Sequence, residues 1–339
     1  MLELIKELCS IDGISGREDA VREFIISKID GYCEYSTDNL GNLIAYKKGR
    51  NPAKNKVMID AHMDEVGMLV TGINDDGTLR FTRAGGIDPK VILGKTFTVG
   101  EKRINGVCGI KPIHLTDKDN ERDIPDADDM YIDIGAQNRD DALTLVTPGD
   151  YICMTGDFVE FGDGFIKSKA LDDRVGCAIM IDMIRSDMEY DCVFSFSVQE
   201  EIGTRGAAAS SYTVNPDYAI ALETTTAADL PGAKEEERVC VTGEGAAVSF
   251  MDRSTVYNHD LYLKALEIAK EKGIKAQVKT KVAGGNNAGA IHKSRGGVKT
   301  AAISVPTRYL HSPCCVCKTD DIKAVRELAE AMAVYMATC

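Results

Sequence analysis

The fold of this chain is decided by the stretch Lys56-Val-Met-Ile-Asp-Ala-His62-Met-Asp64-Glu65. Its apolar residues form a short run that fits a buried strand. The run ends in a histidine and two acidic residues, so the strand would deliver three polar side chains to one edge of a sheet.

Three further apolar runs alternate with helical patterns and give the chain an α/β rhythm. The expected strands cover Val193 to Val198, Tyr218 to Leu222 and Thr300 to Val305, the last stopped by Pro306. The expected helices cover Val175 to Ile184, Asp260 to Lys272 and Ile322 to Met336. We therefore expect an α/β fold.

The first thirty residues show two helical patterns. Leu2, Ile5 and Leu8 recur at helical spacing and predict the first helix. Ser15-Gly-Arg-Glu18 has the pattern of a capping box, in which the serine accepts from a backbone N–H and the glutamate reaches back. We therefore expect a second helix to begin there.

From Gly67 to about Glu160 the sequence changes to short alternating segments separated by Gly, Asp-Gly and Pro-Gly. This pattern is typical of short strands joined by tight turns. We interpret residues 67–164 as an all-β domain inserted into a main domain made of residues 1–66 and 165–339. The acidic stretch 116–129 is interpreted as a solvated loop of the insert.

The formal net charge of −13 limits the choice of partners. An acidic surface repels phosphates and anionic lipid headgroups, so we expect binding to neither nucleic acid nor membrane. The N-terminus lacks the basic and apolar regions of a signal peptide, and every apolar run is too short to span a bilayer. These features indicate a cytoplasmic protein.

The 11 cysteines are odd in number and lack the spacing of a disulfide framework. We expect reduced thiols. The densest group, Cys314-Cys315-Val-Cys317, is interpreted as structural packing, with a redox or metal role as the alternative. Neighbours in sequence cannot easily chelate one ion, and no second cysteine pair follows at zinc-ribbon spacing.

Side chains that suit metal binding follow each of the four predicted strands. Ligands of open α/β sheets bind outside the carboxyl ends of the strands, so these side chains should meet in one crevice. Two aspartates just before a predicted helix add a fifth contribution. The residues are His62, Asp64, Glu65, Glu200, Glu201, Glu223, His311, Asp172 and Asp173.

Histidine and carboxylate ligands together suit zinc, cobalt or manganese. One bridging carboxylate, with one histidine and one terminal carboxylate per metal, would leave room for a shared water. Glu200 and Glu201 can supply one ligand and one proton shuttle, because successive side chains of extended backbone point opposite ways. Asp64 is placed to orient the imidazole of His62. Histidines that close no such strand are interpreted as structural: His114, His259 and His292.

Four sequence blocks are specific in order and spacing. They are Ala61-His-Met-Asp-Glu-Val-Gly67, Lys169-Ala-Leu-Asp-Asp-Arg-Val-Gly176, Gln199-Glu-Glu-Ile-Gly-Thr-Arg-Gly206 and Arg308-Tyr-Leu-His-Ser-Pro313. Together they resemble the signature of the TET-type dinuclear metallo-aminopeptidases, which include glutamyl and deblocking aminopeptidases and proteins formerly named cellulase M. The resemblance covers nearly the whole chain, the insert included.

The resemblance implies a role for each matching position. His62 would bind one metal and His311 the other, with Asp172 as the bridge and a cis peptide between Asp172 and Asp173. Glu200 would be the general base and then the acid, beside Glu201 as a terminal ligand.

Two positions depart from the family pattern. Glu223 stands where the family usually has an aspartate ligand, and its extra methylene could still reach the metal. Asn286-Asn287 stands where relatives often have Thr-Asp, which affects the lining of the pocket rather than the metal ligands.

The resemblance also implies an architecture and an assembly. The fold would be a three-layer α/β/α sandwich with an inserted, barrel-like β-domain used for dimerisation. The dimers would build a homododecamer that takes peptide substrates. Two divalent metal ions per subunit would be zinc or cobalt, with manganese as a third candidate.

On this interpretation the chain removes N-terminal residues from peptides. Glu200 would deprotonate a water shared by the two metals and pass the proton to the departing amine. The alternatives are another amidohydrolase on the same scaffold (a dipeptidase, carboxypeptidase or N-deacylase), an endoglucanase, and a non-enzymatic metal-dependent scaffold.

Overall fold

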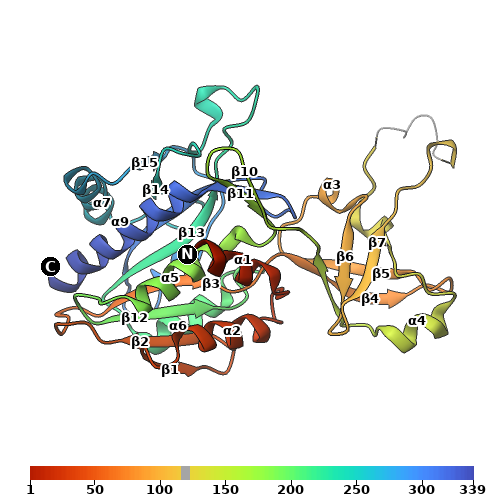
Figure 1. The fold of residues 1–339 in the computed structure, drawn as a ribbon, viewed down its shortest axis with the longest axis horizontal. Coiled ribbons are helices and arrows are strands. Elements are labelled where there is room, and N and C mark those ends of the chain that lie inside the picture. Colours follow the sequence, from red (N-terminus) through yellow and green to blue (C-terminus); the bar gives the residue numbers. More distant parts are fainter. Residues whose placement is uncertain (116–122) are drawn as a thin grey trace.

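The computed structural model describes residues 1–115 and 123–339, which form a large α/β part and a smaller β-barrel beside it (Figure 1). Residues 116–122 of the predicted acidic loop lie outside the described residues. Within the described ranges, no helix has the length and apolar character needed to cross a membrane.

The α/β part is built on a mixed sheet whose four central strands, β12, β3, β13 and β16, are parallel. The strand order is β1-β2-β12-β3-β13-β16-β17-β11-β10, and β14 pairs with β16 and β15. The strands are β1 (Glu34–Thr37), β2 (Leu43–Lys47), β3 (Val57–His62), β10 (Val159–Phe161), β11 (Phe165–Ser168), β12 (Cys192–Ser197), β13 (Tyr218–Thr226), β14 (Ala246–Ser249), β15 (Ala276–Lys279), β16 (Lys299–Arg308) and β17 (Cys315–Lys318).

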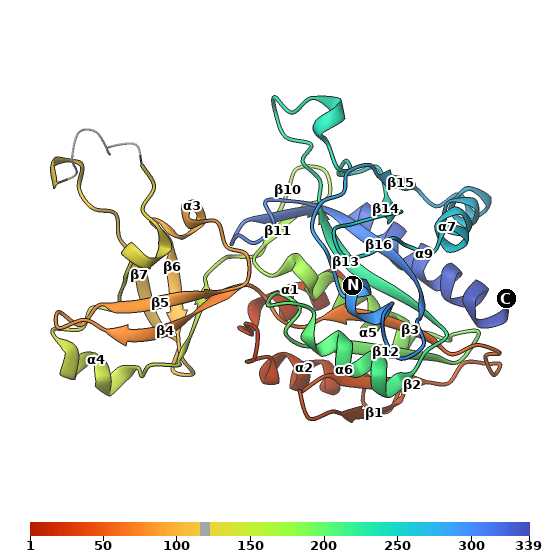
Figure 2. The same cartoon turned by 180° about the vertical axis from the view of Figure 1, so that it is seen from behind.

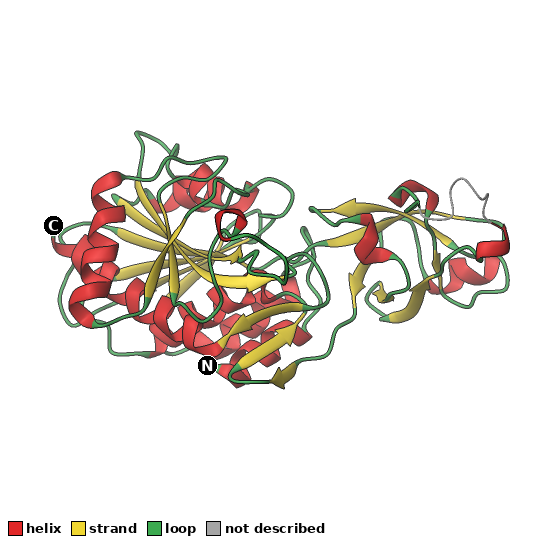
Figure 3. Ribbon diagram, turned by 90° about the horizontal axis from the view of Figure 1, so that it is seen from above, coloured by secondary structure: helices red, strands yellow, loops and turns green. Residues whose placement is uncertain are grey.

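Helices cover both faces of this sheet (Figure 3). Side chains alternate along β3, so Ile59 and Ala61 pack into the core on one face while Met58 packs into the core on the other. The first face carries α1 (Leu2–Ser10), α2 (Asp19–Ile29), α5 (Leu171–Arg185), α7 (His259–Lys272) and α9 (Thr319–Thr338), and the second carries α6 (Arg205–Val214) and α8 (Ala288–Ile291). Figure 2 shows α6 beside β12. The predicted three-layer α/β/α sandwich is therefore confirmed.

The smaller part is a closed six-stranded barrel with an apolar core of its own. Its strands follow the order β4-β5-β8-β7-β6-β9, and short helical turns lie between them. The elements are β4 (Gly67–Ile73), β5 (Leu79–Ala84), α3 (Pro89–Ile92), β6 (Thr96–Val99), β7 (Ile104–Cys108), η1 (Ile113–Leu115), η3 (Ala127–Asp129), β8 (Ile132–Asp133), α4 (Arg139–Leu145) and β9 (Tyr151–Met154). A further turn, η4 (Glu235–Glu237), belongs to the α/β part. The predicted all-β insert is confirmed.

The exact division of the chain at residues 66/67 and 164/165 stays a proposal. The barrel strands run from Gly67 to Met154, whereas β10 and β11 pair with each other and join the large sheet through β17. The return from the insert therefore passes through the edge of the catalytic sheet.

The prediction that Pro306 ends its strand is wrong. Strand β16 continues to Arg308, and Pro306 pairs with Thr225 of β13. On the other side of β16, β14 pairs at Ile303 and Ser304, and β17 pairs beyond Pro306. Proline lacks an N–H to donate, and here it lies in the gap between two neighbouring strands.

The predicted capping box is also wrong. Helix α2 begins at Asp19, and neither Ser15 nor Glu18 caps it with a side chain. The Ser15 hydroxyl instead donates to Asp64, and the Glu18 carboxylate accepts from the backbone of Gly16 and Gln199. Both side chains that the local pattern assigned to the helix cap make other hydrogen bonds instead.

Candidate metal centre

A cavity of about 550 Å³ opens at the carboxyl ends of the parallel strands. This is the edge at which open α/β sheets bind ligands. Its lining contains six of the residues predicted for the site, which come from four strands or their following loops and from the start of α5. They are His62, Asp172, Glu200, Glu201, Glu223 and His311.

Asp172 lies between the two histidines. Nε2 of His62 is 3.4 Å from Oδ1 of Asp172, and Nε2 of His311 is 3.5 Å from Oδ2. Each carboxylate oxygen therefore faces one imidazole, which is the geometry that a bridging ligand requires.

A further carboxylate lies beside each histidine. Oε2 of Glu201 is 3.3 Å from Nε2 of His311, and Oε2 of Glu223 is 3.8 Å from Nε2 of His62. Glu223 lies within β13, which continues to Thr226, so the prediction that this strand ends at Leu222 and that Glu223 follows it is wrong. Its side chain still reaches the cavity.

The buried carboxylates repel one another. Burial and the charge of Asp172 raise the pKa of Glu201 well above its usual range, and burial and the charge of Asp173 do the same for Glu223. Burial also opposes ionisation of Asp172, but the facing imidazoles of His311 and His62 lower its pKa. An excess of buried carboxylates is costly unless cations balance it.

Three of these oxygens have no hydrogen-bond partner among the described residues. They are Oδ1 of Asp172, Oε1 of Glu201 and Oε1 of Glu223. Buried polar atoms in proteins are nearly always paired, so unpaired oxygens on carboxylates that lie beside imidazole nitrogens mark positions that cations would fit. The donor set, imidazole nitrogen and carboxylate oxygen, fits two divalent metal ions.

Both imidazoles are fixed through Nδ1, which leaves Nε2 facing Asp172. Nδ1 of His62 lies 2.9 Å from the backbone oxygen of Asp64, and Nδ1 of His311 lies 2.8 Å from the backbone oxygen of Gly86. A carbonyl oxygen only accepts, so Nδ1 carries the proton in each ring and the Nε2 lone pair is available to a metal. Gly86 follows β5 in the insert, and no pattern in the sequence indicates this contact.

Asp173, next to Asp172, has a different role. The peptide bond between them is cis, as the resemblance implied. The Asp173 carboxylate accepts from the backbone N–H of His62 at 3.3 Å and of Gly176 at 3.1 Å. A Cβ at position 176 would lie 2.6 Å from this carboxylate, so only glycine fits there.

Asp64 lies behind the cavity and holds the segment that carries Glu200. Its carboxylate accepts from the backbone N–H of Glu200 at 2.9 Å and of Glu201 at 3.1 Å, and it lies 3.4 Å from Nδ1 of His62. Glu200 itself lines the cavity, and burial raises its pKa to about 7.

Asn286 and Asn287, which depart from the family pattern, lie in different surroundings. Asn286 lines the cavity and donates to the hydroxyl of Tyr257 at 3.0 Å. Asn287 is fully buried behind it and donates to Asp60 at 2.7 Å and to Ser197 at 2.8 Å. Only Asn286 is placed to contact a substrate.

Other metal-ligating side chains are accounted for. Asp12, Glu65 and Cys153 lie close together, but Nζ of Lys169 lies 2.8 Å from Asp12 and 2.7 Å from Glu65 and takes the cation position. No group of metal-ligating side chains found among the described residues includes Cys314, Cys315 or Cys317. All 11 cysteines are free thiols in the described structure.

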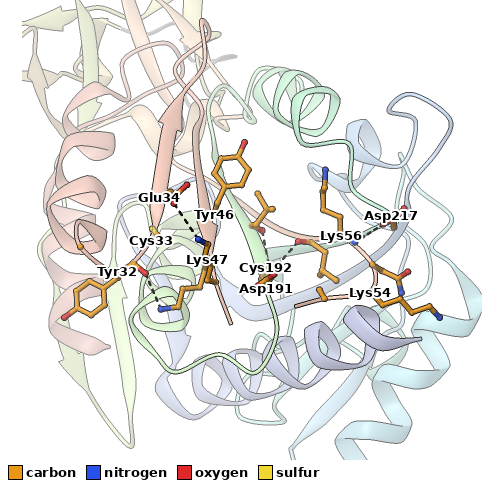
Figure 4. Close-up of a pocket in the computed structure, with 16 residues that line it drawn as sticks. Tyr32, Cys33, Glu34, Tyr46, Lys47, Lys54, Lys56, Asp191, Cys192 and Asp217 are labelled. Atoms are coloured by element: carbon orange, nitrogen blue, oxygen red, sulfur yellow. Dashed lines mark hydrogen bonds and ion pairs between the residues drawn. The ribbon is translucent and has the colours of Figure 1, made fainter. Parts of the chain in front are cut away.

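A second pocket, of about 790 Å³, opens at the opposite ends of β3, β12 and β13 (Figure 4). Two of its lysines donate hydrogen bonds to backbone oxygens: Lys47 to Tyr32, and Lys56 to Val214. It contains no histidine, and the amino ends of strands are not where such sheets bind ligands. Among the described residues, histidine and carboxylate side chains that could hold a metal converge in the first cavity.

The chain also resembles known proteins over nearly its whole length. The profile of the M42 glutamyl aminopeptidase family matches residues 41–328. The lysyl aminopeptidase of Pyrococcus furiosus is 34% identical over 344 residues, which covers 97% of this chain and 96% of that protein.

Two solved structures share the whole fold. The TET aminopeptidase of a marine-sediment Thaumarchaeota archaeon has a TM-score of 0.94 at 32% identity and covers 99% of this chain and 97% of its own. The TET1 peptidase of Pyrococcus horikoshii, which can assemble into a tetrahedron or a large octahedral shell, has a TM-score of 0.86 at 34% identity and covers 98% of both chains. This chain therefore belongs to the M42 glutamyl aminopeptidase family.

Proposed function

We propose that this enzyme cleaves peptides with two divalent metal ions held about Asp172 and with Glu200 as the proton carrier. As a member of its family, the chain is a metallo-aminopeptidase that hydrolyses peptide bonds and releases N-terminal residues. The observation that carries the proposal is the position of Asp172, which turns one oxygen to His62 and the other to His311.

Each metal would have a histidine, a terminal carboxylate and one oxygen of Asp172. His62 and Glu223 would hold one ion, and His311 and Glu201 the other. When bound, two such cations polarise a carbonyl group and lower the pKa of water. The nitrogen and oxygen ligands suit zinc or cobalt, with manganese as a third candidate.

Glu200 is the residue best placed to move the proton. It lines the cavity beside the proposed ligands, and no other described side chain donates a hydrogen bond to its carboxylate. It would take the proton of the attacking water and deliver it to the departing amine, so that its carboxylate returns to its starting state. Asp64 would act as a positioning residue, because its carboxylate binds the backbone N–H of Glu200 and does not line the cavity.

The assembly belongs to the same proposal. We place dimer contacts on the barrel, where apolar side chains are exposed, among them Ile110 at 66% and Val107 and Tyr131 at 46%. We propose that dimers build a homododecamer, as the tetrahedral shell of the Pyrococcus horikoshii relative suggests. A cytoplasmic location fits the free thiols.

The test is a substrate panel on metal-free enzyme reconstituted separately with zinc, cobalt and manganese. Aminoacyl-anilides and peptides with a free N-terminus should be cleaved only after metal is restored. N-acylated amino acids, N-terminally blocked peptides that report C-terminal cleavage, and cellulose should not be cleaved. Cleavage of N-acyl substrates in preference to free N-termini, or cellulose hydrolysis that survives a chelator, would reject the proposal.

A further inference from the structure

We infer that Ser15 and Glu18, from the loop between α1 and α2, are positioning residues for Glu200. They hold the backbone of residues 199–201 from behind, so that the Glu200 carboxylate faces the cavity. This inference rests on the proposed role of Glu200 as the proton carrier.

Four consecutive backbone N–H groups after β12 donate to side chains rather than to a strand or helix. Val198 donates to Asn42 at 2.9 Å, and Gln199 donates to Glu18 at 3.0 Å. Glu200 and Glu201 donate to the two oxygens of Asp64 at 2.9 and 3.1 Å. The acceptors are Asn42, Glu18 and Asp64, and all three belong to the first fifth of the chain.

Glu18 holds the residue whose backbone is least ordinary. Gln199 has a φ of +56°, a backbone conformation that residues other than glycine rarely adopt. Its N–H donates to Oε1 of Glu18, which also accepts from Gly16 at 2.8 Å and is only 4% exposed. Strained residues persist where their surroundings fix them, and the buried carboxylate supplies that restraint.

Ser15 acts one step further back. Its hydroxyl donates to Oδ2 of Asp64 at 2.6 Å, the same oxygen that accepts from Glu201. A backbone hydrogen bond joins the same two segments next to this contact: the N–H of Glu65 donates to the oxygen of Gly13 at 3.0 Å. The loop, the Asp64 carboxylate and the Glu200 backbone therefore form one connected unit.

This arrangement predicts an effect on turnover rather than on binding. A displacement of about 1 Å in a reacting group can lower the rate by about 100-fold. Ser15 and Glu18 are absent from the cavity lining, so their loss should leave the substrate and metal contacts in place.

The experiment measures kcat, KM, metal content and melting temperature for matched variants on one aminoacyl-anilide. Glu18→Ala should lower kcat by about 10- to 100-fold, with KM changed less than about two-fold and two metals still bound. Glu18→Gln keeps an acceptor oxygen and should restore most of that loss. Ser15→Ala should lower kcat in the same direction. The controls are Glu23→Ala and Ser27→Ala on the exposed face of α2.

Two results overturn the inference. The first is wild-type kcat in Glu18→Ala or Ser15→Ala, and the second is a loss that only follows metal content or melting temperature and that Glu18→Gln does not restore. If Glu18→Ala does not fold, Ser15→Ala decides by the same measurements. Glu200→Gln separates the two proposals: if it remains active, the role of Glu200 is wrong, whereas an inactive Glu200→Gln beside a fully active Glu18→Ala rejects this inference alone.

Discussion

The backbone oxygen of Gly86 accepts a hydrogen bond from Nδ1 of His311 at 2.8 Å. Gly86 lies between β5 and α3, so the inserted segment orients a proposed ligand of the catalytic part. A Cβ at position 86 would lie 3.3 Å from Nδ1 of His311, which leaves little room for any other residue. The insert therefore contributes to the metal centre as well as forming a barrel.

Glu200→Gln should leave the metals bound and remove most activity. The amide keeps the size of the side chain but cannot take a proton, and general-base catalysis contributes about 100- to 10,000-fold. Steady-state kinetics with metal analysis checks this, with the exposed Glu23→Gln as the control. Turnover near that of the wild type would show that another group carries the proton.

Glu223→Gln should weaken one metal position and leave the other. The amide removes a negative charge 3.8 Å from Nε2 of His62, whereas Glu201 beside His311 is unchanged. We expect affinity at the His62 position to fall by at least the ~10- to 100-fold typical for loss of an outer-shell partner. Titration of metal-free protein should show one tight ion instead of two, and Glu244→Gln, which is exposed, should still bind two. Equal weakening of both ions would contradict the assignment.

Lys169→Met should destabilise the protein by about 3–5 kcal/mol, because it leaves the carboxylates of Asp12 and Glu65 buried without their shared cation. Urea unfolding measures the loss. Lys48→Met removes an exposed lysine and should change stability by less than about 0.5 kcal/mol. A similar small change in both variants would mean that the buried carboxylates do not need Lys169.

Glu18 should make stability fall as pH rises from about 5 to 8. Burial raises the pKa of Glu18 from 4.5 to about 7, so the folded state binds its proton more tightly than the unfolded state. This contribution is present below pH 4.5 and is lost as pH rises through 7, with a size on the order of 3 kcal/mol. Glu18→Gln lacks the titration, so its stability relative to the wild type should increase over this interval in urea unfolding of the metal-free proteins. A constant or decreasing difference would refute this prediction.

The sequence predicted the parts of the site that have a local signal. His62 closes an apolar run, and Glu200 and Glu201 follow another. The rule that ligands bind at the carboxyl ends of parallel strands was therefore enough to predict that these side chains lie close together, and all three line one cavity. His311 also lines the cavity, although its strand continues through Pro306.

The remaining features depend on tertiary contacts that leave no local pattern. Any residue offers a backbone oxygen, so the contact of Gly86 with His311 has no signature. Ser15 and Glu18 have the spacing of a capping box, but their bonds to Asp64 and Gln199 join segments far apart in the chain. A capping-box pattern covers only four residues, so it cannot indicate hydrogen-bond partners that are distant in the sequence.

Anomalous scattering from a zinc-soaked crystal tests the proposed metal centre. If the ligand assignment is right, two peaks lie in one cavity, the first on Nε2 of His62 and the second on Nε2 of His311, with an oxygen of Asp172 on each. A map with no peak beside Asp172, or with zinc bound elsewhere, would contradict it.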